Sequence, residues 1–130
     1  MPKAPIYFWS CAMLSVGALI AHELLGAPLT LPPLSQAGLS PEVLWLHHFS
    51  WHVGSIAILA MIAMYISAAR RPENPALAVI ATAMGIGFAS LGIGLAIYGD
   101  STMWSTPAPY IWSVVAVLGL AGIATARRTG

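Results

Sequence analysis

The fold is decided by the stretch that runs from Ser67 to Pro75, SAARRPENP. Two arginines followed by a proline end one helix, and an asparagine followed by a proline begins another. Long apolar runs flank the stretch on both sides, and a membrane-spanning helix needs about 20 mostly apolar residues. This segment therefore predicts a short polar turn between two membrane-spanning helices.

Two further apolar runs complete the pattern. Ser40-Pro41-Glu42 and Thr106-Pro107 repeat the capping residue followed by proline. The chain is 58% hydrophobic and 7% charged, whereas a soluble domain carries about 25% charged residues. We therefore expect one all-α, polytopic transmembrane domain over residues 1–130. Its four helices are expected at about 6–25, 41–69, 75–98 and 107–126.

The cations predict the orientation of this bundle. With four spans, all of them fall on one side of the membrane, and the positive-inside rule makes that side cytoplasmic. The sequence thus predicts an antiparallel bundle in a bacterial inner membrane, with both termini in the cytoplasm. The net charge of +1 is too small to indicate a nucleic-acid partner. The five cations are Lys3, Arg70, Arg71, Arg127 and Arg128.

The segment of about residues 26–39, between the first two spans, is rich in proline and leucine. We expect it to lie along the membrane interface or to fold over the bundle as a lid. The third span is rich in small residues, which allow close packing between helices in lipid. Such a helix can pack on neighbours within the chain, on a second protomer or on a larger membrane complex. The residues with this spacing are Gly85, Ala89, Gly92 and Ala96.

Four histidines gather at the outer ends of the first two spans: His22, His47, His48 and His52. Ionisable residues within a membrane are costly, so they are candidates for function. His48 and His52 are four residues apart and project from one helix face. His22 is expected at a similar depth, with Glu23 or Asp100 beside it.

Three chemical interpretations of these residues stay open. In the first, His22 and His52 ligate a haem b, with a glycine of the third span giving the ring room. In the second, His22, His48 and His52 bind one transition metal, oriented by Glu23 or Asp100. In the third there is no cofactor, and His52 with a carboxylate binds the polar head group of a quinone or a lipid.

Two short motifs resemble a loose family of small, uncharacterised four-helix membrane proteins of proteobacterial type. They are Ala21-His22-Glu23-Leu24-Leu25-Gly26 and Ser50-Trp51-His52. The resemblance implies that His22 and His52 are paired functional positions, and it implies no activity.

The sequence thus favours a small inner-membrane protein that binds haem or a metal near its extracytoplasmic face, with a redox role. The alternative is a non-enzymatic accessory subunit of a membrane complex or homo-oligomer, packed through its glycine-rich third helix. No nucleophile–base pair or phosphate-binding loop is present, so no reaction is assigned.

Overall fold

The computed structural model describes residues 4–129 of the chain, and the described part is helical from end to end apart from short turns. Four helical segments are long and apolar enough to cross a membrane, which confirms the expected number of spans. The elements are α1 (Ala4–Ile20), the π-helix η1 (Ala21–Gly26), α2 (Ala27–Ser35), α3 (Pro41–Arg70), α4 (Ala76–Gly94), the π-helix η2 (Leu95–Gly99), the 3₁₀-helix η3 (Ser101–Ser105) and α5 (Ala108–Thr129).

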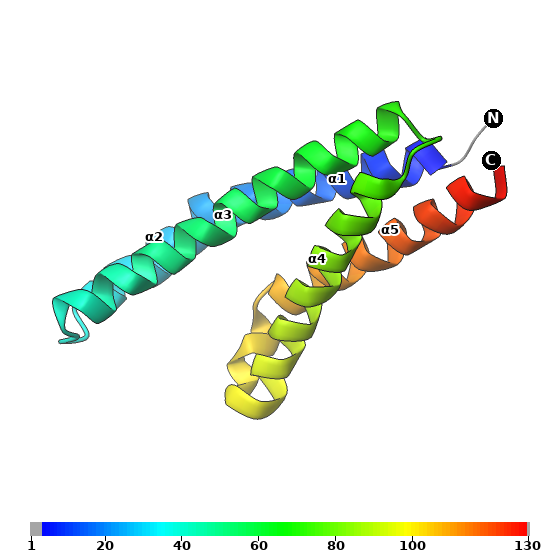
Figure 1. Ribbon diagram of the computed structural model, residues 1–130. Helices are drawn as coiled ribbons and strands as arrows, with labels where there is room; N and C mark the ends of the chain where they lie inside the picture. Colours follow the sequence, from blue (N-terminus) through cyan, green and yellow to red (C-terminus); the bar gives the residue numbers. More distant parts are fainter. Residues whose placement is uncertain (1–3, 130) are drawn as a thin grey trace.

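The helices form two pairs that meet at one end of the molecule and diverge toward the other (Figure 1). In the first pair, the continuous helix α1–η1–α2 lies along α3, and in the second pair α4 lies along α5. Contacts of α1 with α5 and of α3 with α4 join the pairs. The start of α1, the α3–α4 turn and the end of α5 share the end where the pairs meet.

The buried core lies where the two pairs meet. Phe8, Met61, Tyr65 and Val115 are fully buried there, whereas no residue from 21 to 57 is buried. The Tyr65 hydroxyl lies 3.1 Å from Thr82 Oγ1, so a hydrogen bond joins α3 to α4. Close packing and interhelical hydrogen bonds are what hold helices together in lipid, and both are concentrated in this half of the bundle.

Two glycines of α5 permit this close packing. A Cβ atom on Gly119 would lie 2.9 Å from Tyr65 Oη, and one on Gly122 would lie 2.6 Å from Phe8 Cε1. Real Cβ atoms essentially never approach so closely. Any larger residue would therefore push α5 away from α1, α3 and α4.

The proline-rich segment after the first span is not a loop or a lid, as the sequence analysis expected, but the helix α2. It continues the first span without a break, so that the whole segment is 32 residues long. In an α-helix the ring of Pro28 would clash with the carbonyl group of Leu24. The wider π-helical turn of η1 ends just before Pro28, where Ala27 N–H donates to the carbonyl of His22. The extra residue in this turn accommodates the proline, and the helix continues.

The other expected helix ends agree with the structure to within a few residues. Ser40 precedes α3 in an extended conformation, and its hydroxyl accepts from Val43 N–H, 3.5 Å away. Before α4, the side chain of Asn74 accepts from Ala76 N–H at 3.3 Å. The stretch from Ser67 to Pro75 is a short turn, as its sequence predicts.

Candidate functional site: a carboxylate between two imidazoles

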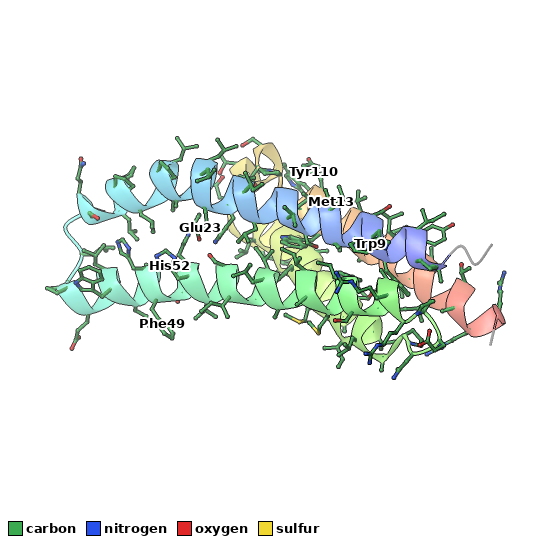
Figure 2. The ribbon with its side chains drawn as sticks, turned by 90° about the horizontal axis from the view of Figure 1, so that it is seen from above. Trp9, Met13, Glu23, Phe49, His52 and Tyr110 are labelled. Carbon is green, nitrogen blue, oxygen red and sulfur yellow. The ribbon has the colours of Figure 1, made fainter. Side chains whose placement is uncertain are left out.

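Five polar and aromatic residues meet where η1 packs on α3, and we call them the Glu23 cluster. Glu23 and His52 point toward each other between the two helices, whereas Phe49 points away from them (Figure 2). The position of the cluster is unusual, because only the first helix pair packs here and the core lies further along both helices. Its members are His22, Glu23, Trp51, His52 and Ser55.

Glu23 lies at the centre of the cluster. Its Oε1 atom lies 3.7 Å from His52 Nδ1 and 4.0 Å from His22 Nε2. The Ser55 hydroxyl donates a hydrogen bond to the same oxygen. A carboxylate that is half-buried among apolar helices needs such partners, because water no longer solvates all of it.

His22 is held between the helices by its ring. The imidazole stacks on the indole of Trp51, with the centroids 4.1 Å apart and the planes 8° from parallel. His22 Nε2 lies 3.2 Å from the backbone carbonyl oxygen of Trp51. A carbonyl oxygen only accepts, so Nε2 carries the proton and donates it. This bond fixes the tautomer of the neutral ring and leaves Nδ1 as its acceptor.

A glycine on each helix makes room for the ring of the other helix. A Cβ atom on Gly26 would lie 3.1 Å from Trp51 Cη2, and one on Gly54 would lie 3.7 Å from His22 Nε2. Helices that carry small residues at their contact can approach closely. A Cβ atom at position 54 would make an ordinary contact with the His22 ring, whereas one at position 26 would crowd the Trp51 indole.

The π-helical turn places the first two members of the cluster. His22 and Glu23 both belong to η1, and a π-helical turn holds one more residue than an α-helical turn. The extra residue changes the direction of side chains relative to the α-helix that precedes it. Such turns are frequent at functional sites, and here the turn carries the central carboxylate.

The remaining sequence-predicted residues lie outside the cluster. The ring of His48 packs against Trp45, with centroids 5.2 Å apart. His47 Nδ1 lies 2.7 Å from the carbonyl oxygen of Val43, one turn earlier in α3. Neither histidine is brought to Glu23 by a contact that the structure records.

Asp100 lies between η2 and η3, which connect α4 to α5 in the helix pair that diverges from the first (Figure 1). Its carboxylate accepts from Thr102 N–H at 2.8 Å and caps η3. This hydrogen bond lowers the pKa of Asp100 below the usual aspartate value. Glu23 is therefore the carboxylate that lies beside His22 and His52, whereas Asp100 bonds Thr102.

The sequence analysis predicted His22, His48 and His52 as metal ligands. Within residues 4–129, no three side chains of histidine, cysteine, aspartate or glutamate gather closely enough to hold a metal ion. His22 also uses Nε2 to bond the Trp51 carbonyl, so ligation through that nitrogen would require the bond to break.

The four small residues of the third span are all buried within the chain. A Cβ atom on Gly85 would lie 3.6 Å from Met61 Cε, and one on Gly92 would lie 3.3 Å from Pro109 Cα. Gly85 and Gly92 thus face α3 and α5 of the same chain. The remaining two, Ala89 and Ala96, are 8% and 5% exposed.

Sequence reasoning singled out His22, Glu23 and His52 but gave no role to Trp51 or Ser55. The spacing held a signal for Ser55, which lies three residues after His52 and so continues the helix face that His48 and His52 share. The role of Trp51 as the stacking partner of His22 had no comparable signal, because a tryptophan near a membrane boundary is ordinarily an interfacial anchor.

No protein-family model matches the chain, and comparisons with curated proteins and with solved structures find no match either. The function of the Glu23 cluster is therefore argued from its own geometry.

Proposed function

We propose that the protein resides in a bacterial inner membrane as an antiparallel bundle with both termini in the cytoplasm, and that its Glu23 cluster binds the polar head group of a membrane-soluble ligand. A quinone is the best chemical match. The observation that carries the proposal is the position of Glu23 Oε1, within 4.0 Å of nitrogens of both His22 and His52.

The cluster offers both kinds of hydrogen-bonding group that a quinone and its reduced form require. A carboxylate accepts from the hydroxyl group of a quinol, and an imidazole N–H donates to the carbonyl group of a quinone. Hydrogen bonds to ionised groups are about twice as strong as those between neutral groups. A phosphate head group fits less well, because Glu23 would repel its charge.

The buried indole N–H of Trp51 adds a further donor. It has no hydrogen-bond acceptor among the described residues, and an unpaired buried donor costs about 1–3 kcal/mol. A polar ligand between η1 and α3 would supply the missing acceptor after a small shift of the indole.

The position of the cluster suits a ligand that arrives through the lipid. The His52 side chain is 57% exposed and belongs to α3, and the second helix pair diverges from the pair that contains α3 (Figure 1). His52 lies about 27 Å along α3 from Arg70, and the hydrocarbon core is about 30 Å thick. The cluster would then lie near the outer boundary of the membrane, at the depth of polar head groups.

The test measures binding of a short-tailed benzoquinone to the purified protein in lipid nanodiscs. Quenching of tryptophan fluorescence reports the binding. We expect Glu23→Gln and His52→Gln each to weaken binding about tenfold, the loss of one charge-assisted hydrogen bond. His47→Gln is the matched control, because this exposed histidine lies on the same helix outside the cluster. Equal binding by all three variants would refute the proposal.

The same histidines would serve a haem b or a transition metal, so the purified protein needs an absorption spectrum, oxidised and reduced, and a metal analysis. A Soret band or a stoichiometric metal that is lost in both His22→Ala and His52→Ala would show that the site binds that cofactor instead of a quinone. The accessory-subunit alternative predicts that these variants change neither ligand content nor quinone binding.

A further inference from the structure

The turn between α3 and α4 lies at the end of the molecule where the helix pairs meet (Figure 1), and a second polar site lies beside this turn. It is a hollow of about 500 Å³ beside the turn between α3 and α4. The hollow is lined by Ser67, Arg70, Arg71, Asn74, Ala76 and Leu77.

Two arginines line this hollow, and neither has a carboxylate partner among the described residues. The ion pairs recorded within residues 4–128 involve only histidines and Glu23. Glu73 belongs to the same turn but is not part of the lining. Two unpaired arginines on one concave surface give it a local charge of +2, which favours an anionic ligand. Guanidinium groups suit phosphate in particular, because they bind its oxygens in pairs.

Two backbone hydrogen bonds hold the turn that carries the arginines. Arg71 N–H donates to the carbonyl of Ser67 at 3.1 Å, and Asn74 N–H donates to the carbonyl of Arg71 at 3.0 Å. The side-chain oxygen of Asn74 already accepts from Ala76 N–H, so the Asn74 amide nitrogen remains as a donor. The Ser67 hydroxyl provides another donor, and the hollow therefore presents donors of several kinds to one ligand.

The remaining wall of the hollow is apolar and continues into the membrane-spanning part of α4. Ala76 is the first residue of a candidate span, and Arg70 is the last residue of another. Ala76 and Leu77 are exposed. A ligand that fills the hollow thus meets cations on one side and the membrane boundary on the other. This combination matches a phospholipid, whose phosphate lies directly above its acyl chains.

We propose that this hollow binds a phosphate group, supplied by the head group of an anionic phospholipid such as phosphatidylglycerol. Basic pockets between spanning helices on the positively charged side bind such head groups. The proposal rests on the four spans and on the arginine-lined hollow. It does not depend on the ligand of the Glu23 cluster.

The test is native mass spectrometry of the protein released from nanodiscs that contain equal amounts of phosphatidylglycerol and phosphatidylcholine. We expect one phosphatidylglycerol retained per chain in the wild type. We expect about 30-fold weaker retention in the double variant Arg70→Gln/Arg71→Gln, because each cation near the membrane surface contributes about a fivefold factor in affinity. The matched control is Arg127→Gln/Arg128→Gln, which removes the same charge at the same end of the molecule.

The control distinguishes binding in the hollow from non-specific electrostatic attraction between the anionic lipid and the basic end of the protein. Equal loss in both double variants, or no preference for phosphatidylglycerol in the wild type, would overturn the proposal. Soluble glycerol phosphate added in millimolar excess distinguishes the source of the phosphate. If it displaces the lipid, the hollow binds free phosphate esters and the lipid assignment falls. The variant Arg70→Lys/Arg71→Lys keeps the charge, so it remains informative if the glutamine variant misfolds, and we expect it to retain the lipid more strongly than the glutamine variant does.

Discussion

The imidazole of His22 lies flat on the indole of Trp51, with the ring centroids 4.1 Å apart. This contact joins η1 to α3 in the part of the molecule where no residue is buried. Because Glu23 follows His22 directly, the stack also fixes the direction in which the carboxylate points. The geometry of the Glu23 cluster therefore depends on an aromatic contact as well as on its ionisable groups.

Loss of the stacking partner is expected to destabilise the first helix pair. Trp51→Ala removes the stack and much of the contact between η1 and α3, so we expect the free energy of unfolding to fall by about 2–3 kcal/mol. Trp51→Phe keeps an aromatic ring and should cost about 1 kcal/mol. The control is Trp45→Ala, because Trp45 is 67% exposed on the same helix. Denaturant titration in detergent followed by circular dichroism measures the difference, and equal losses for Trp45 and Trp51 would contradict this role.

The hydrogen bond between Tyr65 and Thr82 should show as a coupling between α3 and α4. Tyr65→Phe and Thr82→Val each remove one partner, and the double variant removes both. We expect a coupling energy of about 0.6 kcal/mol, the usual size for such bonds between membrane helices. The measurement is a double-mutant cycle of unfolding free energies. Strict additivity of the two substitutions would show that the 3.1 Å contact contributes nothing.

A methyl group added at Gly119 is expected to separate the two helix pairs. Gly119→Ala forces Tyr65 and Thr82 away from α5, and overpacking of this kind costs about 1–3 kcal/mol. Gly87→Ala is the matched control, because no atom lies within 4 Å of the added Cβ position. It should be neutral or stabilising by up to about 1 kcal/mol, since alanine is the better helix former. Thermal unfolding of both variants tests this, and a similar melting temperature for the two would refute it.

The cap of η3 should weaken in acid. The hydrogen bond from Thr102 N–H lowers the pKa of Asp100 in the folded protein. A lowered folded-state pKa means that the stabilisation is complete above the ordinary aspartate pKa and is lost as the pH falls through the lowered value. The amide resonance of Thr102, followed by NMR, should titrate with a midpoint below the ordinary aspartate pKa. Asp100→Asn should abolish this titration and leave the helices intact.

Much of the fold follows from local patterns that a sequence displays directly. The turn around Arg70 and Arg71 could be predicted because a polar stretch between two apolar runs has few other solutions in a membrane. The continuation of the first span through Pro28, Pro32 and Pro33 could not be predicted from the sequence. Proline ordinarily ends a helix. The π-helical turn η1 accommodates Pro28, and Pro32 and Pro33 lie inside α2.

The candidate site was predictable in part for a similar reason. His22, Glu23 and His52 follow from the rule that ionisable residues in a membrane need partners. The choice between Glu23 and Asp100 as the neighbouring carboxylate depends on the angle between the two helix pairs. That angle is set by close contacts in the core, such as those at Gly119 and Gly122, and no local pattern of the sequence contains it.

The divergence of the two helix pairs (Figure 1) would give a membrane-embedded bundle different cross-sections in the two leaflets of a bilayer. Where the pairs meet, four helices share one compact footprint. Where they separate, the bundle would displace more area in that leaflet. A body of this shape would respond to lateral pressure, because compression of the broader leaflet would drive the pairs together.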